Sequence, residues 1–398
     1  MNGPVSRNPL LSFLGSYGLA CVLLFFLFLL TLLGTFAQVS DGLYAVQKRY
    51  FESWYVLQPV GPFKLPLPGG ALCMGLLALN LLVGGLVRIR KTPATAGILV
   101  AHIGIVVMMV AALVKWRFSE EGFLRLYEGQ QSDTWVSYHD WEVAVWDASQ
   151  LEDVRELIVR DDLFEDLSEG RRRTFTSPQL PFRIVLQHYA VNADVLPKGP
   201  MWEGYGPTVD GYAVRQLDPE RDNENNLPAV QVEIVSDDGS SERGILWGGE
   251  RAAWVVEVGG RRFALTLRKE LHNMPYTIRL DDFRKVDHPG TSMPASFESD
   301  VSQIAAGNER QVLIQMNEPL RDGGLVLFQS SWGPSNARPG EPLFSVFSVA
   351  RNPSDQWPLI SCIIVSIGLL WAYGRRLLQY IRSQKPARRT VADAAGTR

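Results

Sequence analysis

The chain has 398 residues, of which 39 are lysine or arginine and 42 are aspartate or glutamate, so its formal net charge is only −3. This total combines nearly charge-free apolar stretches with a region as charged as a soluble protein, so net charge says little about partners. No nucleic-acid partner is expected. All three cysteines, Cys21, Cys73 and Cys362, lie in long apolar stretches. Their spacing excludes a C-x-x-C redox pair, a zinc cluster and a C-x-x-C-H site for covalently attached haem.

Four apolar stretches predict four transmembrane helices, at residues 14–37, 69–87, 97–116 and 357–373. A helix needs about 20 apolar residues to cross the hydrocarbon core, and each stretch is near or above that length. The first stretch is longer than the core of a signal peptide and lacks a convincing small-residue cleavage site. We therefore expect the first span to be retained.

Basic residues predict which side of the membrane each connection occupies. Arg88, Arg90 and Lys91 lie between the second and third spans, and a basic tail follows the fourth, as is typical of cytoplasmic segments. Both termini are then cytoplasmic, and the two long connections are extracytoplasmic. The expected divisions are the N-terminus and first span at 1–37, an outer loop at 38–68, the second and third spans at 69–116, an outer domain at 117–356, the fourth span at 357–374 and a cytoplasmic tail at 375–398.

The outer domain has the sequence pattern of a β protein. Alternating or β-branched runs such as WEVAVWD, PFRIVLQHYAV and AAWVVEVGG recur between turn signals. Asp238-Gly239 and Gly259-Gly260 predict hairpin turns, and residues 150–167 predict one amphipathic helix. The expected fold is an integral membrane α-helical protein with a large extracytoplasmic β-rich domain, a sandwich or distorted barrel, inserted between the third and fourth helices.

The first outer loop allows two interpretations. Residues 43–58, LYAVQKRYFESWYVLQ, have the composition of an amphipathic helix that lies on the membrane and ends at a cluster of prolines. An ordinary packed loop fits the same residues equally well.

No catalytic constellation stands out in the outer domain. Its four histidines, His139, His188, His272 and His288, are too far apart in the sequence to indicate a metal site. We interpret them as surface or hydrogen-bonded side chains. Acid pairs such as Asp161-Asp162 are interpreted as solvated turns.

His102 is the only acidic, basic or histidine side chain that lies away from the ends of the four spans. An ionisable group inside the membrane is costly to bury and indicates a functional site by default. A neutral imidazole binds iron through one nitrogen while it stays uncharged, which suits a haem axial ligand in the cytoplasmic half of the membrane. The alternative is a packing histidine that hydrogen-bonds a backbone carbonyl or a hydroxyl of a neighbouring helix. A proton relay is disfavoured because it needs further titratable groups in the spans.

Small residues follow one side of the third span. Gly97, Ala101, Gly104 and Ala111 recur at helical spacings, which allow a helix to be approached closely. We expect this side to admit a large partner or a cofactor.

Asn80 is the other strongly polar residue of a span, at a depth similar to that of His102. Its amide is expected either to fix the His102 tautomer through a hydrogen bond, as a second-shell group of the haem site, or to hydrogen-bond across helices for packing alone.

Several motifs occur in a characteristic order along nearly the whole chain. LGTFAQV ends the first span, YFESW follows in the loop, and AHIGIVV begins the third span. LDDFRKVDHPGTSMPASFESDV and IQMNEPLRDGGLVLFQSSW follow late in the outer domain. In this order they resemble the ResB family, also called CcsB, of the System II cytochrome c biogenesis machinery. Asp322-Gly323-Gly324 departs from the aromatic-containing turn of that family, which affects only the local surface.

The resemblance implies a subunit that works with a ResC- or CcsA-type membrane partner to carry haem b across the membrane for covalent attachment to apocytochrome c. It implies that His102 is an axial ligand of the haem iron at an inner-leaflet site, paired with a histidine of the partner. The partner's tryptophan-rich haem-handling loop is absent here, so the chain is expected to be a non-catalytic subunit of a haem lyase. The implied location is the bacterial inner membrane, although a thylakoid membrane has equivalent sidedness.

Two other functions are kept open. In one, the chain is a scaffold whose β domain binds apocytochrome c while the partner alone handles haem. In the other, it is an unrelated membrane-anchored sensor or envelope protein, which is favoured only if the order of the motifs is discarded.

Overall fold

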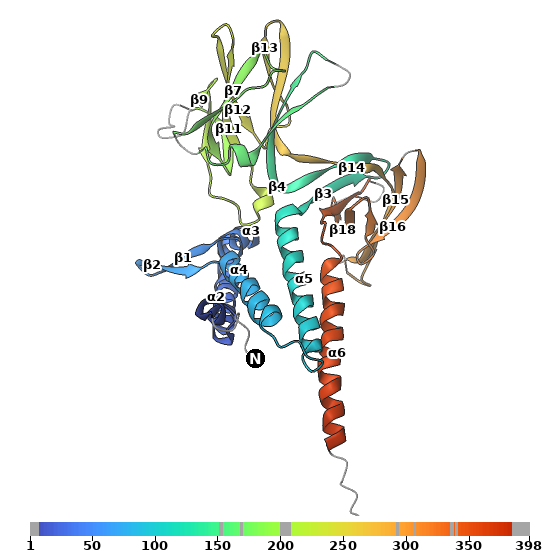
Figure 1. Ribbon diagram of the computed structural model, residues 1–398. Coiled ribbons are helices and arrows are strands. Elements are labelled where there is room, and N and C mark those ends of the chain that lie inside the picture. The colour runs from blue at the N-terminus through green and yellow to red at the C-terminus, as the bar shows by residue number, and fades with distance from the viewer. Residues whose placement is uncertain are drawn as a thin grey trace, which may run out of the picture. The chain divides into compact units, whose positions relative to one another are not determined.

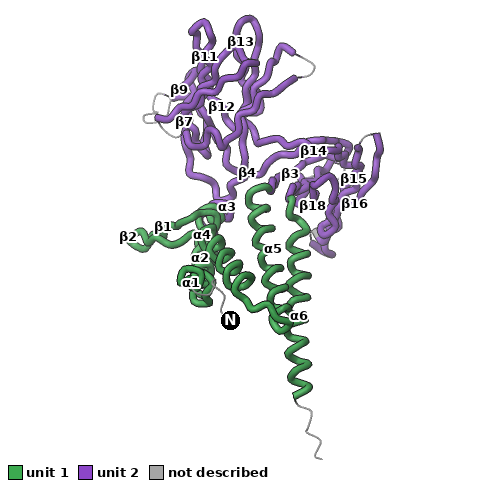
Figure 2. Tube along the Cα trace, viewed as in Figure 1, with its two compact units in different colours: residues 1–37, 46–118, 353–398 green, residues 38–45, 119–352 purple. Residues whose placement is uncertain are grey.

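The structure is a computed structural model that describes residues 8–150, 154–167, 170–199, 208–291, 294–305, 307–334, 338 and 341–383 (Figure 1). The chain forms two compact units, shown in different colours in Figure 2. The helical unit contains residues 1–37, 46–118 and 353–398, and the β-rich unit contains residues 38–45 and 119–352.

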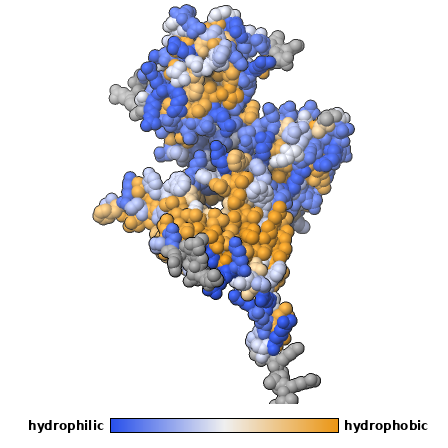
Figure 3. Space-filling model, viewed as in Figure 1, coloured by the Kyte–Doolittle hydropathy of each residue, from blue (hydrophilic) through white to orange (hydrophobic). Residues whose placement is uncertain are grey.

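Within the residues that the structure describes, four helical segments are long and apolar enough to cross a membrane, as the sequence predicts. They are Tyr17–Asp41, Gly70–Val87, Ala96–Phe118 and Trp357–Ser383. On the face shown in Figure 3, hydrophobic side chains cover much of these helices. The elements that contain or flank them are α1 Pro9–Leu14, α2 Tyr17–Asp41, α3 Leu43–Val46, η2 Gln47–Phe51, β1 Tyr55–Val60, β2 Phe63–Pro68, α4 Gly70–Asn80, η3 Leu81–Val87, α5 Ala96–Phe118 and α6 Trp357–Ser383.

The small-residue side of α5 packs against α6, so the expectation that it admits a partner or cofactor is wrong. A Cβ atom on Gly97 would lie 2.6 Å from the Gly368 carbonyl oxygen, so the two helices meet backbone to backbone. The Ser361 hydroxyl donates a hydrogen bond of 2.6 Å to the Gly104 carbonyl oxygen. The spacing correctly predicts close helix packing. The helix that packs on this side is α6 of the same chain, and its Ser361 lies more than 250 residues from Gly104 in the sequence.

Residues 43–58 form neither a single amphipathic helix nor a featureless loop. The helical part, α3 and η2, ends at Phe51, and the remainder enters the antiparallel hairpin of β1 and β2. Tyr50 is buried against α2 and α4, and its hydroxyl donates to Gln58 Oε1 at 2.6 Å. Tyr50 therefore points into the helical unit. The helix ends one residue later, at Phe51, and the chain returns as the strands β1 and β2.

The β-rich unit is built around two long paired strands, β4 Gln131–Asp147 and β14 Arg261–Asp287. They belong to a ten-stranded antiparallel sheet with β3 Glu120–Tyr127, β5 Leu157–Arg160, β13 Trp254–Val258, β15 Pro294–Ala305, β16 Asn308–Gln315, β17 Leu320–Asp322, β18 Leu325–Gly333 and β19 Phe344–Arg351. A four-stranded sheet contains β6 Arg172–Phe175, β7 Phe182–Ala190, β11 Ala229–Ser236 and β12 Ser241–Trp247. A three-stranded sheet contains β8 Ala193–Pro197, β9 Thr208–Val209 and β10 Tyr212–Gln216.

The two long strands contribute to two separate hydrophobic cores. The first core lies between the four-stranded sheet and the part of the ten-stranded sheet that includes Val143 and Leu265. The second is enclosed by the rest of the ten-stranded sheet, and Trp135 and Ile278 are fully buried in it. β16 contacts β18 although the two lie near opposite ends of the strand order, so this part of the sheet curls around its core. Each core thus resembles one of the two expected architectures, a sandwich and a distorted barrel.

The predicted hairpin turns are confirmed, and the predicted helix is wrong. Gly239 lies between β11 and β12, and Gly259 and Gly260 connect β13 to β14 with positive φ angles of 60° and 75°. Residues 157–160 of the predicted helix at 150–167 form β5, which pairs with β4. Val159 is buried in the first core from this strand, so burial by pairing overrides the helical pattern. Residues 151–153 of that prediction lie outside the described residues.

Candidate functional site

His102 lies in the first two turns of α5, roughly 9 Å along the axis from Ala96. Its Nδ1 atom is 3.1 Å from the carbonyl oxygen of Gly85 in η3. A carbonyl oxygen only accepts hydrogen bonds, so the Nδ1 atom carries the proton in this contact. The neutral ring therefore keeps an unprotonated Nε2, the nitrogen that a metal ion would bind.

The Gly85 carbonyl accepts this hydrogen bond because η3 ends only two residues later, at Val87. The last carbonyls of a helix have no partner within the helix and must be satisfied from outside. η3 is also a π-helical continuation of α4, in which the Arg88 amide reaches back to the Val83 carbonyl. Such segments are rare and occur frequently at functional sites.

Two consecutive glycines allow η3 to be approached closely on both sides. A Cβ atom on Gly85 would lie 2.7 Å from His102 Nδ1, and one on Gly84 would lie 2.8 Å from the Gly15 carbonyl oxygen. Neither position tolerates a side chain without a shift. The glycine pair therefore sets the distance between η3 and the imidazole.

Asn80 does not provide the hydrogen bond that holds His102. Its Nδ2 atom donates to the carbonyl oxygens of Leu14 and Ser16, at 2.6 Å and 3.0 Å. These carbonyls lie where α1 ends and α2 begins. The amide satisfies the Leu14 carbonyl at this break, and it adds a second hydrogen bond to the Ser16 carbonyl, which also accepts the Ala20 amide at 3.3 Å. The contacts match the second interpretation from the sequence, cross-helix hydrogen bonding, and the hydrogen bond to the ring comes from Gly85 instead.

An apolar cavity of about 460 Å³ lies on the face of α5 that carries His102. Met109 and Leu113 line it, and they follow His102 by seven and eleven residues, which places all three on one side of the helix. Met74 and Ala78 of α4 line the opposite wall. The imidazole therefore belongs to a face of α5 that the helices of this chain leave partly uncovered.

The histidines of the β-rich unit have partners of their own. His139 stacks on Tyr44 with ring centroids 4.1 Å apart, and its Nδ1 is 3.1 Å from Asn223 Nδ2. His272 stacks on Trp135 at 4.2 Å. Within the described residues, no group of three or more His, Cys, Asp or Glu side chains is placed to hold a metal ion.

His188 and His288, the other two predicted surface histidines, lie at turns or strand irregularities. His188 in β7 has a positive φ of 53°, and the carbonyl of His288 accepts the Thr291 amide at 3.0 Å. Neither residue is close to His102 in the sequence, and the hydrogen bond of His288 is with a residue of the β-rich unit.

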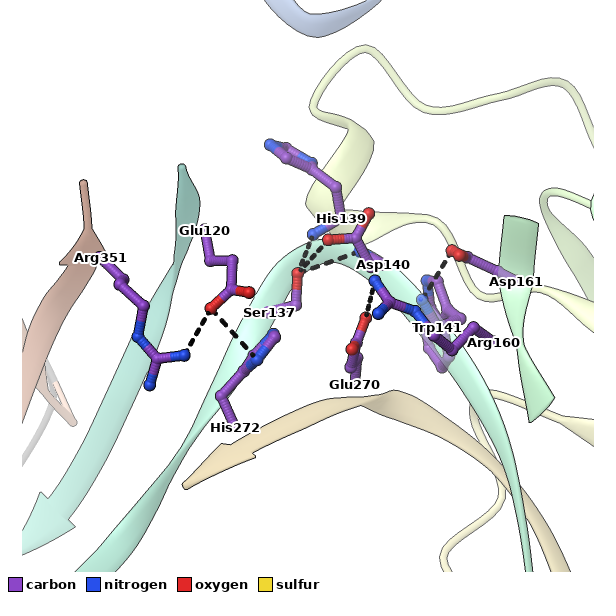
Figure 4. Close-up of polar contacts among 10 residues, drawn as sticks. All are labelled: Glu120, Ser137, His139, Asp140, Trp141, Arg160, Asp161, Glu270, His272 and Arg351. Atoms are coloured by element: carbon purple, nitrogen blue, oxygen red, sulfur yellow. Dashed lines mark hydrogen bonds and ion pairs between the residues drawn. The ribbon is translucent and has the colours of Figure 1, made fainter. Parts of the chain in front are cut away.

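A second polar cluster, which the sequence reasoning missed, lies where β4 and β14 pass from one core to the other (Figure 4). Glu270 is buried there, and Arg160 is its ion-pair partner at 3.6 Å. Asp161, taken from the sequence as a solvated turn residue, accepts the Trp141 amide at 2.8 Å, and burial raises its pKa to about 6. The signal available in the sequence was LRKELHN, a run of charged residues inside a strand pattern.

Lys269 completes this cluster on the side of Trp141. Its Nζ atom donates to the Tyr138 carbonyl oxygen at 2.6 Å and lies 4.7 Å from the centre of the Trp141 ring. Burial lowers the pKa of Lys269 to about 8, an effect that nearby carboxylates such as Asp140 oppose. The cluster therefore gathers several groups that titrate closer to neutrality than usual.

The chain matches one known family model, and no curated protein matches it. The model of the ResB-like family matches residues 242–343, which lie wholly in the β-rich unit. Ser299 and Gln329, from the two late motifs, lie in this segment and hydrogen-bond to each other at 2.7 Å in the second core. These motif residues thus hold strands together, and the family match points to cytochrome c biogenesis. The match confirms, over this segment of the β-rich unit, the resemblance to the ResB family that the motifs predict.

Proposed function

We propose that the chain is the haem-handling subunit of a System II cytochrome c synthase, which works with a ResC- or CcsA-type membrane partner. His102 is the proposed axial ligand of the haem iron. The single observation that carries this proposal is the hydrogen bond between His102 Nδ1 and the Gly85 carbonyl oxygen.

The packing alternative from the sequence predicts the same contact with a backbone carbonyl, and the hydrogen bond is also of the kind that metal-bound histidines make. A ligating imidazole usually donates its other ring N–H to a carbonyl or a carboxylate, which fixes the tautomer and the ring orientation. In this chain the carbonyl belongs to a helix end, so the acceptor cannot rotate away as a side chain does. Nε2 then remains as the iron-binding atom of a neutral ligand, which suits an apolar setting.

The face of α5 that carries the ring favours a planar apolar cargo over a small ion. About two turns beyond His102 on this face, a cavity is lined by Met109, Leu113 and Met74 and, at its polar end, by Gln47 and Glu52. Its volume is within the range of small-molecule sites. Haem b is the proposed transported substrate. One histidine supplies one axial position, so the second ligand would come from the partner.

The proposed setting is the bacterial inner membrane, with both termini cytoplasmic and the β-rich unit extracytoplasmic. Arg88, Arg90 and Lys91 follow η3, and Arg375, Arg376 and Arg382 lie in the last turns of α6. Basic residues beside spans favour the cytoplasmic side. With this orientation His102 lies in the inner half of the membrane, and apocytochrome c would meet the β-rich unit outside.

The test is the visible spectrum of the chain purified with its partner, as wild type and as His102→Ala, with and without added imidazole. We expect the variant to lose most of the low-spin haem bands and imidazole to restore them, because imidazole replaces the missing ligand. His288→Ala is the matched control, since His288 is exposed in the β-rich unit. Wild-type haem content and axial ligation in His102→Ala would show that the assignment is wrong.

A scaffold function is the second candidate, and the position of the family match favours it. Residues 242–343 lie in the β-rich unit and include none of the helical site. In that case the β-rich unit would bind apocytochrome c while the partner handles haem. Normal haem content together with normal cytochrome maturation in His102→Ala would support the scaffold function over the haem-ligand function.

A further inference from the structure

The pairing of β4 with β14 is interrupted where the two cores meet. Lys269 pairs with Trp141, and Leu271 pairs with Val136. One residue of β14, Glu270, therefore faces four residues of β4, 137–140. The Ser137 hydroxyl holds this bulge together, because it donates to Asp140 Oδ2 at 2.9 Å and accepts the Asp140 amide at 3.1 Å. β-bulges often aim a side chain at a specific site.

Glu270 is the side chain at this interruption, and its carboxyl group is poorly compensated. The side chain is only 10% exposed, and its Oε2 atom has no hydrogen-bond partner. Arg160 Nη2 approaches to 3.6 Å, but the Arg160 side chain is 62% exposed. Water screens so exposed a cation, and a carboxylate out of water is costly without hydrogen bonds.

Apart from Arg160, the charges that act most on Glu270 are negative. Asp140 comes from β4, and Asp161 comes from the short helix after β5 (Figure 4). Glu142 of β4 acts in the same sense. The neighbouring cations have other partners: Arg268 lies 2.8 Å from Glu142, and Lys269 donates to the Tyr138 carbonyl oxygen. Burial first, and then these three carboxylates, raise the pKa of Glu270 to about 7, while Arg160 opposes the rise. The site favours a proton on Glu270 over a negative charge.

We propose that Glu270 is a proton-operated latch between the two cores of the β-rich unit. With its proton the carboxyl group is neutral, and β4 and β14 stay paired on both sides of the bulge. Without the proton the buried charge is repelled by Asp140 and Asp161, and the pairing of β4 with β14 loosens at residues 137–141 and 269–272. This inference does not depend on the haem proposal.

The direction of the pH effect follows from the two pKa values. The pKa of Glu270 is about 7 in the closed strands and 4.5 for an unburied glutamate. Stability is therefore complete below about pH 4.5 and falls as the pH rises through 7, because the open form releases its proton more readily. From pH 6 to pH 8, opening should become roughly tenfold more favourable.

The test is amide hydrogen exchange of the full chain in lipid nanodiscs at pH 6 and pH 8, corrected for the intrinsic effect of pH on exchange. In the wild type we expect protection at residues 137–141 and 269–272 to fall roughly tenfold at the higher pH. Glu270→Gln should lose most of this pH dependence, because the amide mimics the protonated acid and only the smaller contributions of Asp161 and Lys269 remain. Glu257→Gln, at an exposed position of β13, should behave as the wild type.

A second variant keeps the proposal testable if Glu270→Gln does not fold. Arg160→Gln removes the one cation that lowers the pKa of Glu270, so its loss of protection should move to higher pH. Infrared difference spectra recorded across a pH titration should contain a carboxyl signal with a midpoint near pH 7 that is absent in Glu270→Gln. In Arg160→Gln this signal should have its midpoint at a higher pH. Equal protection of the wild type at both pH values, or an unchanged midpoint in Arg160→Gln, would overturn the latch.

Discussion

His102 in the helical unit and Glu270 in the β-rich unit are both ionisable side chains out of full contact with water, and the two units accommodate them differently. The imidazole meets a backbone carbonyl at 3.1 Å, at the end of a helix where that carbonyl has no partner within the helix. The carboxyl group meets an exposed guanidinium at 3.6 Å and has an oxygen without a hydrogen bond.

The difference arises from what each group needs. A neutral imidazole needs one acceptor to fix its orientation, and every helix end supplies free carbonyls. An ionised carboxylate needs several donors, which a strand pair with an interrupted ladder does not supply. The helical unit therefore holds one ring in one tautomer, whereas the β-rich unit leaves the protonation of its carboxyl group open to change.

The largest expected effect comes from breaking the contact of His102 with the backbone. In Gly85→Ala, the new Cβ atom would lie 2.7 Å from Nδ1, so the ring or η3 must shift. Under the haem proposal, we expect a severalfold loss of bound haem in the purified complex, measured by its visible spectrum. The protein should still fold, since the change lies at one contact of a helix end.

Gly18→Ala is the matched control for this substitution, because nothing lies within 4 Å of a Cβ atom on Gly18 in α2. It should retain wild-type haem. If Gly85→Ala also retains full haem and an unchanged spectrum, the close approach of η3 does not set the position of the ligand.

A smaller effect is expected from Asn80→Ala, which separates the role of Asn80 from that of Gly85. The variant removes the side-chain donor of the Leu14 carbonyl oxygen and one of two donors to the Ser16 carbonyl oxygen, which should cost about 1–2 kcal/mol of stability. Thermal unfolding in detergent measures this loss. Haem content per folded complex should not change, and a loss of haem at unchanged stability would restore Asn80 as the group that orients His102.

The sequence predicts the local parts of the helical site and misses the long-range ones. The position of His102 inside a span and the small-residue side of α5 can both be predicted from one apolar stretch, because they depend only on span length and helical periodicity. The hydrogen bond from His102 to the Gly85 carbonyl of η3 depends on contacts between distant segments. The packing of α6 over Gly97 and Gly104 does so too. Two adjacent glycines in the second span were the available signal for the first of these contacts.

The β-rich unit shows the same limit on a larger scale. Short strands and glycine turns are visible in the sequence, yet β14 runs unbroken from Arg261 to Asp287 because bulges absorb the mismatches with β4. Strand pattern alone does not reveal that Glu270 faces a bulge 130 residues earlier in the chain. The cluster around Glu270, whose groups titrate near neutrality, lies at this bulge. There the alternation of side chains along one strand conflicts with the pairing between distant strands.

The smallest expected effect tests the other side of α5, where backbone groups are already satisfied within the chain. Ser361→Ala removes the hydroxyl that donates to Gly104 at 2.6 Å, and Ser366→Ala changes the same residue type at an exposed position of α6. A cross-helix hydrogen bond of this kind is worth about 0.6 kcal/mol, so Ser361→Ala should lower thermal stability slightly, and Ser366→Ala should not. Neither variant should change bound haem, since His102 lies on the other face of α5. A loss of haem in Ser361→Ala alone would mean that packing against α6, and not only the Gly85 carbonyl, positions the ring.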